Sequence, residues 1–189
     1  MKIIAISYPE EYKEEHNIIN ELFNNGLEIF HLRKPLWTSD KIVSLLDMID
    51  ASFHNRIVLH SHYELSEGLK GIHFTGKNKH LIKEYKNVNI HKSISCHSFE
   101  ETQQYAEIMD YSFISPVFDS ISKKGYKANI DFACLKENAK KQNLVLLGGI
   151  NDINLNELKE IRPYGIAVLG HLWNSNNVIK AFKDIQECI

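Results

Sequence analysis

Short apolar runs rich in β-branched residues recur along the chain, and amphipathic segments lie between several of them. The short runs predict strands, and apolar residues spaced three and four positions apart predict helices. Because parallel strands need crossover connections, the pattern predicts an α/β fold. We expect a single-domain (β/α)8 TIM barrel over residues 1–189, with a doubly wound open sheet as the alternative. The expected strands are residues 2–7, 27–33, 56–60, 71–75, 89–95, 111–115, 144–149 and 165–170.

The expected helices carry local start and stop signals. Gly26 can end the first helix in a left-handed conformation, and Ser39 is a favourable N-cap for the second. Ser98 and Glu101 form a capping box. The chain is short for this fold, so some helices must be about two turns or less, and the crossover at residues 63–69 is the weakest. The expected helices are residues 10–25, 39–49, 98–109, 132–142, 155–161 and 177–188.

Composition and charge exclude several classes of partner. A formal net charge of -2 gives no long-range field to attract nucleic acid or an anionic membrane, so neither is expected as a partner. The three cysteines are an odd number without CxxC spacing, which argues against a disulfide framework and fits a reducing cytoplasm. The N-terminus turns acidic early, unlike a signal peptide. We expect a cytoplasmic protein, and the sequence leaves its oligomeric state open.

In a (β/α)8 barrel the active site lies at the C-terminal ends of the strands, and this rule selects a short set of residues. His31 and Arg33 share one face of their strand because side chains alternate, whereas Lys34 points the other way. The loop after the sixth strand, SPVFDSISKKG, places hydroxyls and lysines directly behind a buried run. The selected residues are His31, Arg33, His60, Ser95, Ser120, Ser122, Lys123, Gly149, Leu169 and Gly170.

Glycines end the last two expected strands. Barrels often hold a phosphate on the loops after strands seven and eight, where backbone N–H groups face the anion. Gly148, Gly149 and Gly170 permit close approach of an anion to the main chain. A glycine pair can also simply end a strand tightly, but glycines at both of these strands favour a phosphate site.

Several short motifs occur along the chain in a familiar order. They are HLRK at residues 31–34, HS at 60–61, SISCHSFEE at 93–101, PVF followed by hydroxyls and lysine at 116–123, GGI at 148–150 and GIAV at 165–168. Together they resemble the thiamine-phosphate synthases and the related thiazole tautomerases, which are small TIM barrels. The resemblance runs over nearly the whole chain and implies a role in thiamine biosynthesis. The family's transferase joins a hydroxymethylpyrimidine diphosphate to a thiazole phosphate and releases pyrophosphate, with Mg²⁺ on the departing group.

The resemblance also implies roles for individual residues. Arg33 corresponds to a pyrophosphate-binding arginine, and His31 replaces a glutamine that contacts the pyrimidine. Ser95 and Lys123 correspond to residues that contact the diphosphate and the bridging region. The residues implied for the thiazole phosphate are Ser120 and Ser122, which replace threonines, and the backbone at Gly149, Leu169 and Gly170.

Other positions depart from the family pattern. Ser61 and Asn78 stand where the resemblance expects acidic ligands of Mg²⁺, an ion that usually takes one or two carboxylates. Mg²⁺ is therefore implied as the cofactor but lacks its usual ligands here. Pro35 replaces a pyrophosphate lysine, for which Lys34 substitutes only if the backbone turns. The histidine that tautomerases use after strand six is Pro116.

Histidines lie near the ends of several expected strands. His60 and His62, together with His31, are candidates for an imidazole cluster, which suits zinc or nickel rather than magnesium. Alternate histidines at a strand end are more often simply hydrogen-bonded or solvated. His31 or His60 is also a candidate acid–base group, because an imidazole can transfer protons near neutral pH. We expect three further histidines to be structural: His73, His91 and His97.

The sequence leaves three functions open, all with phosphorylated small molecules as partners. The first is the transferase, with a thiazole phosphate and a pyrimidine diphosphate as substrates. The second is isomerisation of the thiazole phosphate by a histidine base without a metal. The third is a non-catalytic protein that binds thiazole or thiamine phosphate. Pyrophosphate release and dependence on Mg²⁺ distinguish the first from the others.

Overall fold

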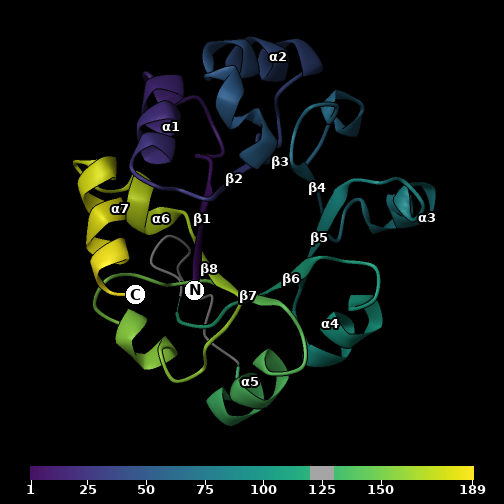
Figure 1. Cartoon of the computed structure of the whole chain (residues 1–189), viewed down its shortest axis with the longest axis vertical. Coiled ribbons are helices and arrows are strands. Elements are labelled where there is room, and N and C mark those ends of the chain that lie inside the picture. The colour runs from purple at the N-terminus through teal and green to yellow at the C-terminus, as the bar shows by residue number, and fades with distance from the viewer. Residues whose placement is uncertain (120–129) are drawn as a thin grey trace.

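A closed barrel of parallel strands forms the centre of the molecule. The computed structural model describes residues 1–119 and 130–189, and within them eight strands pair in chain order. β1 pairs with β8 and closes the ring, so the (β/α)8 prediction is confirmed and the open-sheet alternative is wrong. Figure 1 shows the strands as an inner ring with the helices outside it. The strands are β1 (Lys2–Ile6), β2 (Ile29–Leu32), β3 (Ile57–Leu59), β4 (Gly71–Phe74), β5 (His91–Cys96), β6 (Tyr111–Ile114), β7 (Leu144–Leu147) and β8 (Gly165–Val168).

The helices on the outer face are shorter than their sequence patterns predict. The first begins late because Glu14 adopts a left-handed conformation with φ of 56°, which does not continue into a helix. The weak crossover contains only the 3₁₀ helix Tyr63–Leu65, and the expected helix 155–161 is the 3₁₀ helix Leu155–Leu158. The α-helices are α1 (Glu15–Asn24), α2 (Ser39–Met48), α3 (Ile82–Tyr85), α4 (Phe99–Tyr105), α5 (Phe132–Ala139), α6 (Gly170–Trp173) and α7 (Val178–Glu187).

Two helix starts differ in detail from the expected caps. The Ser98 hydroxyl accepts a hydrogen bond from the Glu101 backbone N–H at 3.2 Å, as a capping box requires. The Glu101 carboxylate, however, accepts from the backbone N–H of His97 (2.8 Å), one residue earlier than the reciprocal bond of a capping box. The prediction of Ser39 as an N-cap is wrong, because Thr38 is the N-cap residue and Ser39 is the first residue of α2.

The strands bury both faces, and their outward residues pack against the helices. Phe30 and Leu32 of β2, for example, belong to the large apolar cluster that includes residues of α1, α2 and α7. The inward residues fill the barrel itself, as alternation along each strand requires. On the β7, β8 and β1 side these are apolar, whereas the β2 to β6 side carries histidine, serine and tyrosine. The interior is therefore apolar on one side and mixed on the other, where Ile29, Val58 and Phe113 accompany the polar residues.

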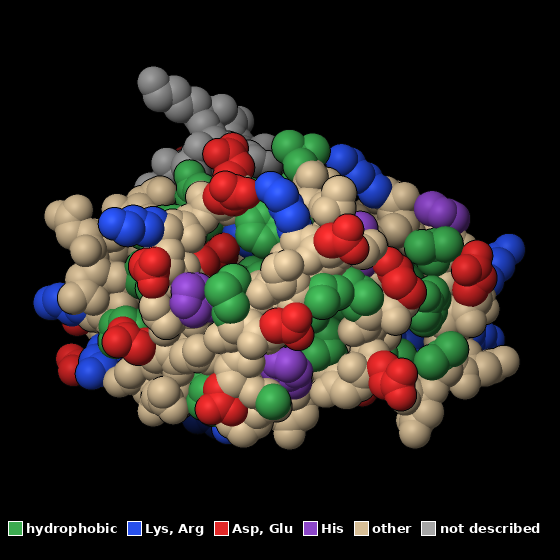
Figure 2. Space-filling view, turned by 90° about the horizontal axis from the view of Figure 1, so that it is seen from above, with side chains coloured by type: hydrophobic (Ala, Val, Ile, Leu, Met, Phe, Trp, Pro, Cys, Tyr) green, Lys and Arg blue, Asp and Glu red, His purple; other side chains and the backbone are tan. Residues whose placement is uncertain are grey.

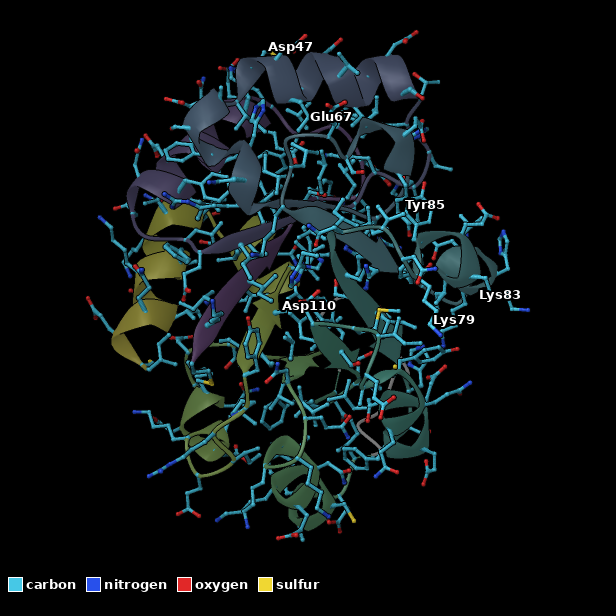
Figure 3. The ribbon with its side chains drawn as sticks, turned by 45° about the vertical axis from the view of Figure 1, so that its right-hand side comes forward. Asp47, Glu67, Lys79, Lys83, Tyr85 and Asp110 are labelled. Carbon is cyan, nitrogen blue, oxygen red and sulfur yellow. The ribbon has the colours of Figure 1, made fainter. Side chains whose placement is uncertain are left out.

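The outer surface mixes charges of both signs. Figure 2 shows acidic and basic side chains interspersed on one face, without a broad field of either sign. Figure 3 shows Lys79, Lys83 and Tyr85 gathered at α3 on the outside of the ring, with Asp47 on the outer helix α2. Among residues 1–119 and 130–189, no helix combines the length and the apolar character needed to cross a membrane.

Gly71 opens β4 directly against β5, where it pairs with His91. A Cβ atom at position 71 would overlap the backbone carbonyl of His91, which cannot move without disturbing the sheet. We expect Gly71→Ala to lower the free energy of unfolding by about 1–3 kcal/mol, measured by urea denaturation. Gly76→Ala is the matched control, because no atom lies within 4 Å of its added Cβ. Equal losses in the two variants would contradict this account.

Candidate functional site

A cavity of about 690 Å³ opens at the C-terminal end of the barrel. Every strand contributes to its wall, either with residues near its C-terminal end or with the residues that follow it. This is the location that the barrel fold predicts for an active site. One wall residue from each strand or its end, in order from β1 to β8, is Ile6, Arg33, His60, Thr75, Ser95, Phe113, Leu147 and Ala167.

The cavity brings together part of the predicted site. Six selected residues line it: Arg33, His60, Ser95, Gly149, Leu169 and Gly170. His31 lies deeper in the barrel, fully buried and beneath the wall. The predictions for Ser120, Ser122 and Lys123 lie outside the described residues.

The described wall residues include one arginine and no carboxylate. Arg33 faces the cavity and forms no ion pair within residues 1–119 and 130–189, and His97 and His171 lie at the rim. The sequence of residues 120–129 also contains no Asp or Glu. Because unpaired positive charge at a partly buried site favours an anion, the cavity suits a phosphorylated ligand.

The glycines after β7 have a structural reason as well as a functional one. Gly148 and Gly149 adopt φ angles of 106° and 67°, and a Cβ at either would overlap the loop after β6. The carbonyl of Gly149 accepts a hydrogen bond from the Asn154 side chain at 2.9 Å. In the described part of the chain, the backbone N–H groups of Gly149 and Gly170 make no hydrogen bond. The glycines therefore allow tight packing against the loop after β6, and they also leave backbone N–H groups available to bind an anion at this edge of the cavity.

Beneath the cavity, histidines from neighbouring strands form a hydrogen-bonded cluster. His31 Nδ1 lies 2.8 Å from His60 Nε2, and His31 Nε2 lies 2.6 Å from the Tyr111 hydroxyl. His73 lies against both, and its Nδ1 and Nε2 contact the hydroxyls of Ser93 and Ser95, each at 2.8 Å. His60 reaches the cavity wall, and its Nδ1 atom has no hydrogen-bond partner among the described residues.

The membership of this cluster corrects the sequence hypothesis. His62 was expected to join His31 and His60, but it lies outside the barrel, with ring nitrogens 3.0 Å from Ser39 Oγ and 2.8 Å from the carbonyl of Trp37. The strand ends at Leu59, and His62 has a left-handed φ of 54°, so alternation no longer sets its direction. His73 takes its place, because β4 neighbours β3 and points this residue inward.

Burial keeps these imidazoles neutral. It lowers the pKa of His73 from 6.5 to about 3, with a smaller contribution from the positive charge of Arg33. Burial, reinforced by the nearby His73, also holds the pKa values of His31 and His60 well below 6.5. At neutral pH the cluster therefore consists of neutral imidazoles, the form in which histidine binds a metal ion.

Lys34 does not replace the lysine lost at Pro35. Its ammonium group is buried beneath α1, where it forms an ion pair with Glu15 and donates to the carbonyl of Glu10 at 2.6 Å. Burial raises the pKa of Glu15 and lowers that of Lys34, while the ion pair opposes both shifts. Lys34 therefore serves the packing of α1 on the barrel.

The residues at the family's Mg²⁺ positions do not fit that ion. The Asn78 side chain donates to the His60 carbonyl (3.2 Å) and the Tyr63 hydroxyl (2.6 Å), and its oxygen accepts from the Thr75 backbone. Ser61 does not line the cavity, and no described wall residue supplies a carboxylate. Mg²⁺ takes oxygen ligands, usually including carboxylates, so this chain lacks the donor set that it needs.

Several wall residues escaped the sequence analysis. Phe113 is an inward residue of β6. Alternation along the strand places it on the same face as Tyr111, so the sequence pattern predicts its direction. Tyr8 comes from the loop after β1 and His171 from the short helix α6 after β8, and no periodicity in the sequence marks them. Trp37 and Trp173 do not line the cavity; the Trp173 indole is buried and donates to the carbonyl of Ile6 at 2.6 Å.

Fold and cavity together define a (β/α)8-barrel protein whose mouth combines cationic side chains with exposed backbone amides. A family model described as thiamine monophosphate synthase matches residues 3–172. The chain therefore belongs to the thiamine monophosphate synthase family, a family of enzymes of thiamine biosynthesis.

Individual relatives agree with this assignment. The chain is 24% identical over 186 residues to the thiamine-phosphate synthase of Oceanobacillus iheyensis, covering 90% of this chain and 89% of that protein. It is 35% identical to a solved thiamine phosphate pyrophosphorylase from Bacteroides thetaiotaomicron, with a TM-score of 0.82 and coverage of 100% and 97%. A thiamine phosphate pyrophosphorylase structure from Pyrococcus furiosus, 17% identical with a TM-score of 0.84 and coverage of 99% and 94%, shares the fold.

The neutral buried histidines make stability depend on pH. Below pH 6.5 these histidines bind protons in the unfolded chain but remain neutral in the folded cluster. The free energy of unfolding therefore falls as pH falls toward about 3, where His73 itself titrates in the folded protein. Each such histidine contributes a slope of about 1.4 kcal/mol per pH unit. We expect His73→Gln to reduce this slope in urea denaturation between pH 6 and pH 4, taken as roughly the steepest range. His62→Gln is the control, and a slope that His73→Gln leaves unchanged would contradict the account.

The buried ion pair of Lys34 predicts a large effect on stability. Lys34→Met leaves the Glu15 carboxylate buried without its partner, and we expect a loss of about 3–5 kcal/mol in urea denaturation. The double variant Glu15→Leu/Lys34→Met should recover most of this loss. Lys41→Met is the matched control, because its ion pair with Glu11 is exposed to solvent and contributes little to stability. The account is wrong if Lys34→Met and Lys41→Met cost the same.

Proposed function

We propose that the chain is a transferase of the thiamine-phosphate synthase type. It joins a hydroxymethylpyrimidine diphosphate to a thiazole phosphate: the new C–N bond forms as the bond from carbon to the diphosphate oxygen breaks and pyrophosphate leaves. The proposal includes the cytoplasmic location that the cysteine pattern favours. The observation that carries it is one cavity lined both by Arg33 and by the glycines after β7 and β8, with no carboxylate among its described wall residues.

The two phosphorylated substrates need two anion sites, and the wall offers both. Backbone N–H groups at Gly149 and Gly170, with Leu169 beside them, suit the monophosphate of the thiazole. Arg33, with Ser95 nearby on the wall, suits the diphosphate. Ser120, Ser122 and Lys123, which lie outside the described residues, keep the roles that the family resemblance implies. The apolar residues Ile6, Leu147 and Ala167 offer a surface for the rings.

In this proposal the chain's own cationic side chains neutralise the charge of the leaving pyrophosphate. Arg33 lies at the wall without a carboxylate to neutralise it, and a guanidinium binds phosphate oxygens in pairs. Lys123 is the second cation that the family resemblance supplies. Because the family's carboxylates are absent, no step of the reaction is assigned to Mg²⁺.

A second candidate is isomerisation of the thiazole phosphate at the same cavity. It is favoured by His60, whose neutral imidazole reaches the wall with Nδ1 unpaired among the described residues. Such a nitrogen can accept a proton from a bound ring, and the reaction needs only one substrate. Isomer conversion without pyrophosphate chemistry would mark this function.

The test is a coupled assay of pyrophosphate release by the purified protein with both substrates, with and without added Mg²⁺. We expect release that does not require added Mg²⁺, and a loss of about 10²–10³-fold in kcat for Arg33→Gln. Arg162→Gln, an exposed arginine before β8 at the opposite end of the barrel, is the matched control and should retain full activity.

The outcomes separate the three functions. No pyrophosphate release under either condition, with thiazole phosphate still bound in equilibrium dialysis, would overturn the transferase proposal. Conversion of the thiazole phosphate alone would then identify the isomerase, and binding without conversion would identify a phosphate-binding protein.

A further inference from the structure

Three buried histidines converge from neighbouring strands at the floor of the cavity. His31 lies on β2, His60 directly after β3 and His73 on β4, and all three point into the barrel. One ring nitrogen from each lies within 4.8 Å of the other two. Their exposed fractions are 0%, 8% and 0%. Three imidazoles in one barrel interior need a physical explanation, because apolar side chains would fill this space without the cost of burying polar atoms.

Two of the three ring pairs have separations close to those of a three-histidine metal site, whereas His60 and His73 are stacked at 26° and would have to separate to share an ion. Ring centroids lie 5.0 Å apart for His31 and His60, 5.1 Å for His31 and His73, and 4.2 Å for His60 and His73. Ligand nitrogens about 2.1 Å from a tetrahedral ion lie roughly 3.4 Å from one another. The 2.8 Å contact from His31 Nδ1 to His60 Nε2 needs to open by only about 0.6 Å to reach that separation.

The outer nitrogens of His31 and His73 already have the partners that metal-binding histidines usually have. Metal-ligating histidines use the second ring nitrogen to bond a neighbouring group, which fixes the ring and its tautomer. His31 Nε2 contacts the Tyr111 hydroxyl at 2.6 Å, and His73 Nδ1 contacts Ser93 Oγ at 2.8 Å. His31 Nδ1 and His73 Nε2 then remain as ligand atoms, the latter after displacing its 2.8 Å contact with Ser95 Oγ.

An independent observation concerns His60. Its Nδ1 atom is buried and has no hydrogen-bond partner among the described residues. A buried polar atom left unpaired costs about 1–3 kcal/mol. With Nε2 as the ligand atom, Nδ1 is the outer nitrogen of His60, and the hydrogen bonds of the cluster do not satisfy it. His60 and Ser95 both reach the cavity wall, so an ion held here would present its open coordination position to the cavity.

We propose that His31, His60 and His73 bind one transition metal ion at the cavity floor. Neutral imidazoles without a carboxylate suit zinc, cobalt(II) or nickel(II) and do not suit magnesium. Three protein ligands with a fourth position open to solvent is the arrangement of catalytic zinc sites. The fourth ligand is water or an oxygen of the bound substrate.

The direct test uses the metals alone on the full chain. After treatment with a chelator and its removal, Zn²⁺ is titrated calorimetrically, and Co²⁺ binding is followed by its visible absorption. We expect one Zn²⁺ per chain and the intense absorption of four-coordinate Co²⁺. No stoichiometric uptake of either metal by the folded wild-type chain would overturn the proposal.

Variants locate the site. His73→Gln should abolish Zn²⁺ binding, whereas His62→Gln should leave it unchanged, because His62 bonds Ser39 and Trp37 outside the barrel. Tyr111→Phe, which keeps all three ligands and removes only the hydroxyl behind His31, should weaken Zn²⁺ binding about 10- to 100-fold. If His73→Gln fails to fold by circular dichroism, the affinity of Tyr111→Phe and its Co²⁺ spectrum decide.

Zn²⁺ binding that is equally strong in wild type, folded His73→Gln and Tyr111→Phe would place the metal elsewhere and overturn the assignment. The measurements need no substrate and no turnover. A failure of the metal site is therefore distinguishable from a failure of the proposed transferase.

Discussion

Closure of the parallel sheet is the constraint on which the rest of the molecule depends. β1 and β8 lie at opposite ends of the chain, and their pairing joins Lys2 to Gly165 and Ala5 to Val168. Gly165 suits this seam, because a Cβ there would lie 2.8 Å from the Lys2 carbonyl oxygen. Since all strands run the same way, closure brings every C-terminal strand end to one mouth. Residues as distant in sequence as Arg33 and Gly170 share a cavity for this reason alone.

Closure of the sheet also creates a barrel interior that inward-facing side chains must fill, and the two sides of this interior carry different kinds of residue. Ile4, Ile6, Val145 and Ala167 occupy one side, and the histidine cluster with its serine and tyrosine partners occupies the other. Apolar packing stabilises a barrel at least as well as buried hydrogen bonds do, since the net gain from a typical hydrogen bond is only about 0.5–1.5 kcal/mol. A polar cluster beneath the mouth therefore has its best explanation in function, because buried imidazoles add little to stability beyond what they cost.

The fold was predictable from the sequence because its signals are local. Most strands are short runs rich in apolar residues, because both of their faces are buried, and all eight strands of the described chain could be placed within a few residues. The glycines after β7 and β8 and the arginine after β2 were also placed, because strand ends locate them without knowledge of packing. Helix ends were less predictable: α1 starts late through the left-handed Glu14, and four-residue helices such as α6 show no periodicity. The choice of His62 instead of His73 failed because it required knowing where β3 ends and which strand lies beside it.

The loss of the family's acidic positions looks severe when each is taken alone, but the charges must be counted together. Two carboxylates and a divalent cation sum to zero, so their joint removal alone leaves the net charge unchanged, and the remaining difference is the lysine that Pro35 replaces. If the cation and one carboxylate were lost while the other carboxylate remained, that carboxylate would instead place a negative charge beside the diphosphate. Ser61, Asn78 and the carboxylate-free wall are consistent with the complete exchange. Arg33 keeps its place in this exchange, and a metal on the neutral histidines would add positive charge without an acidic ligand to offset it. Such an ion would act on a phosphorylated ligand with its full charge, because none of that charge is neutralised by carboxylates.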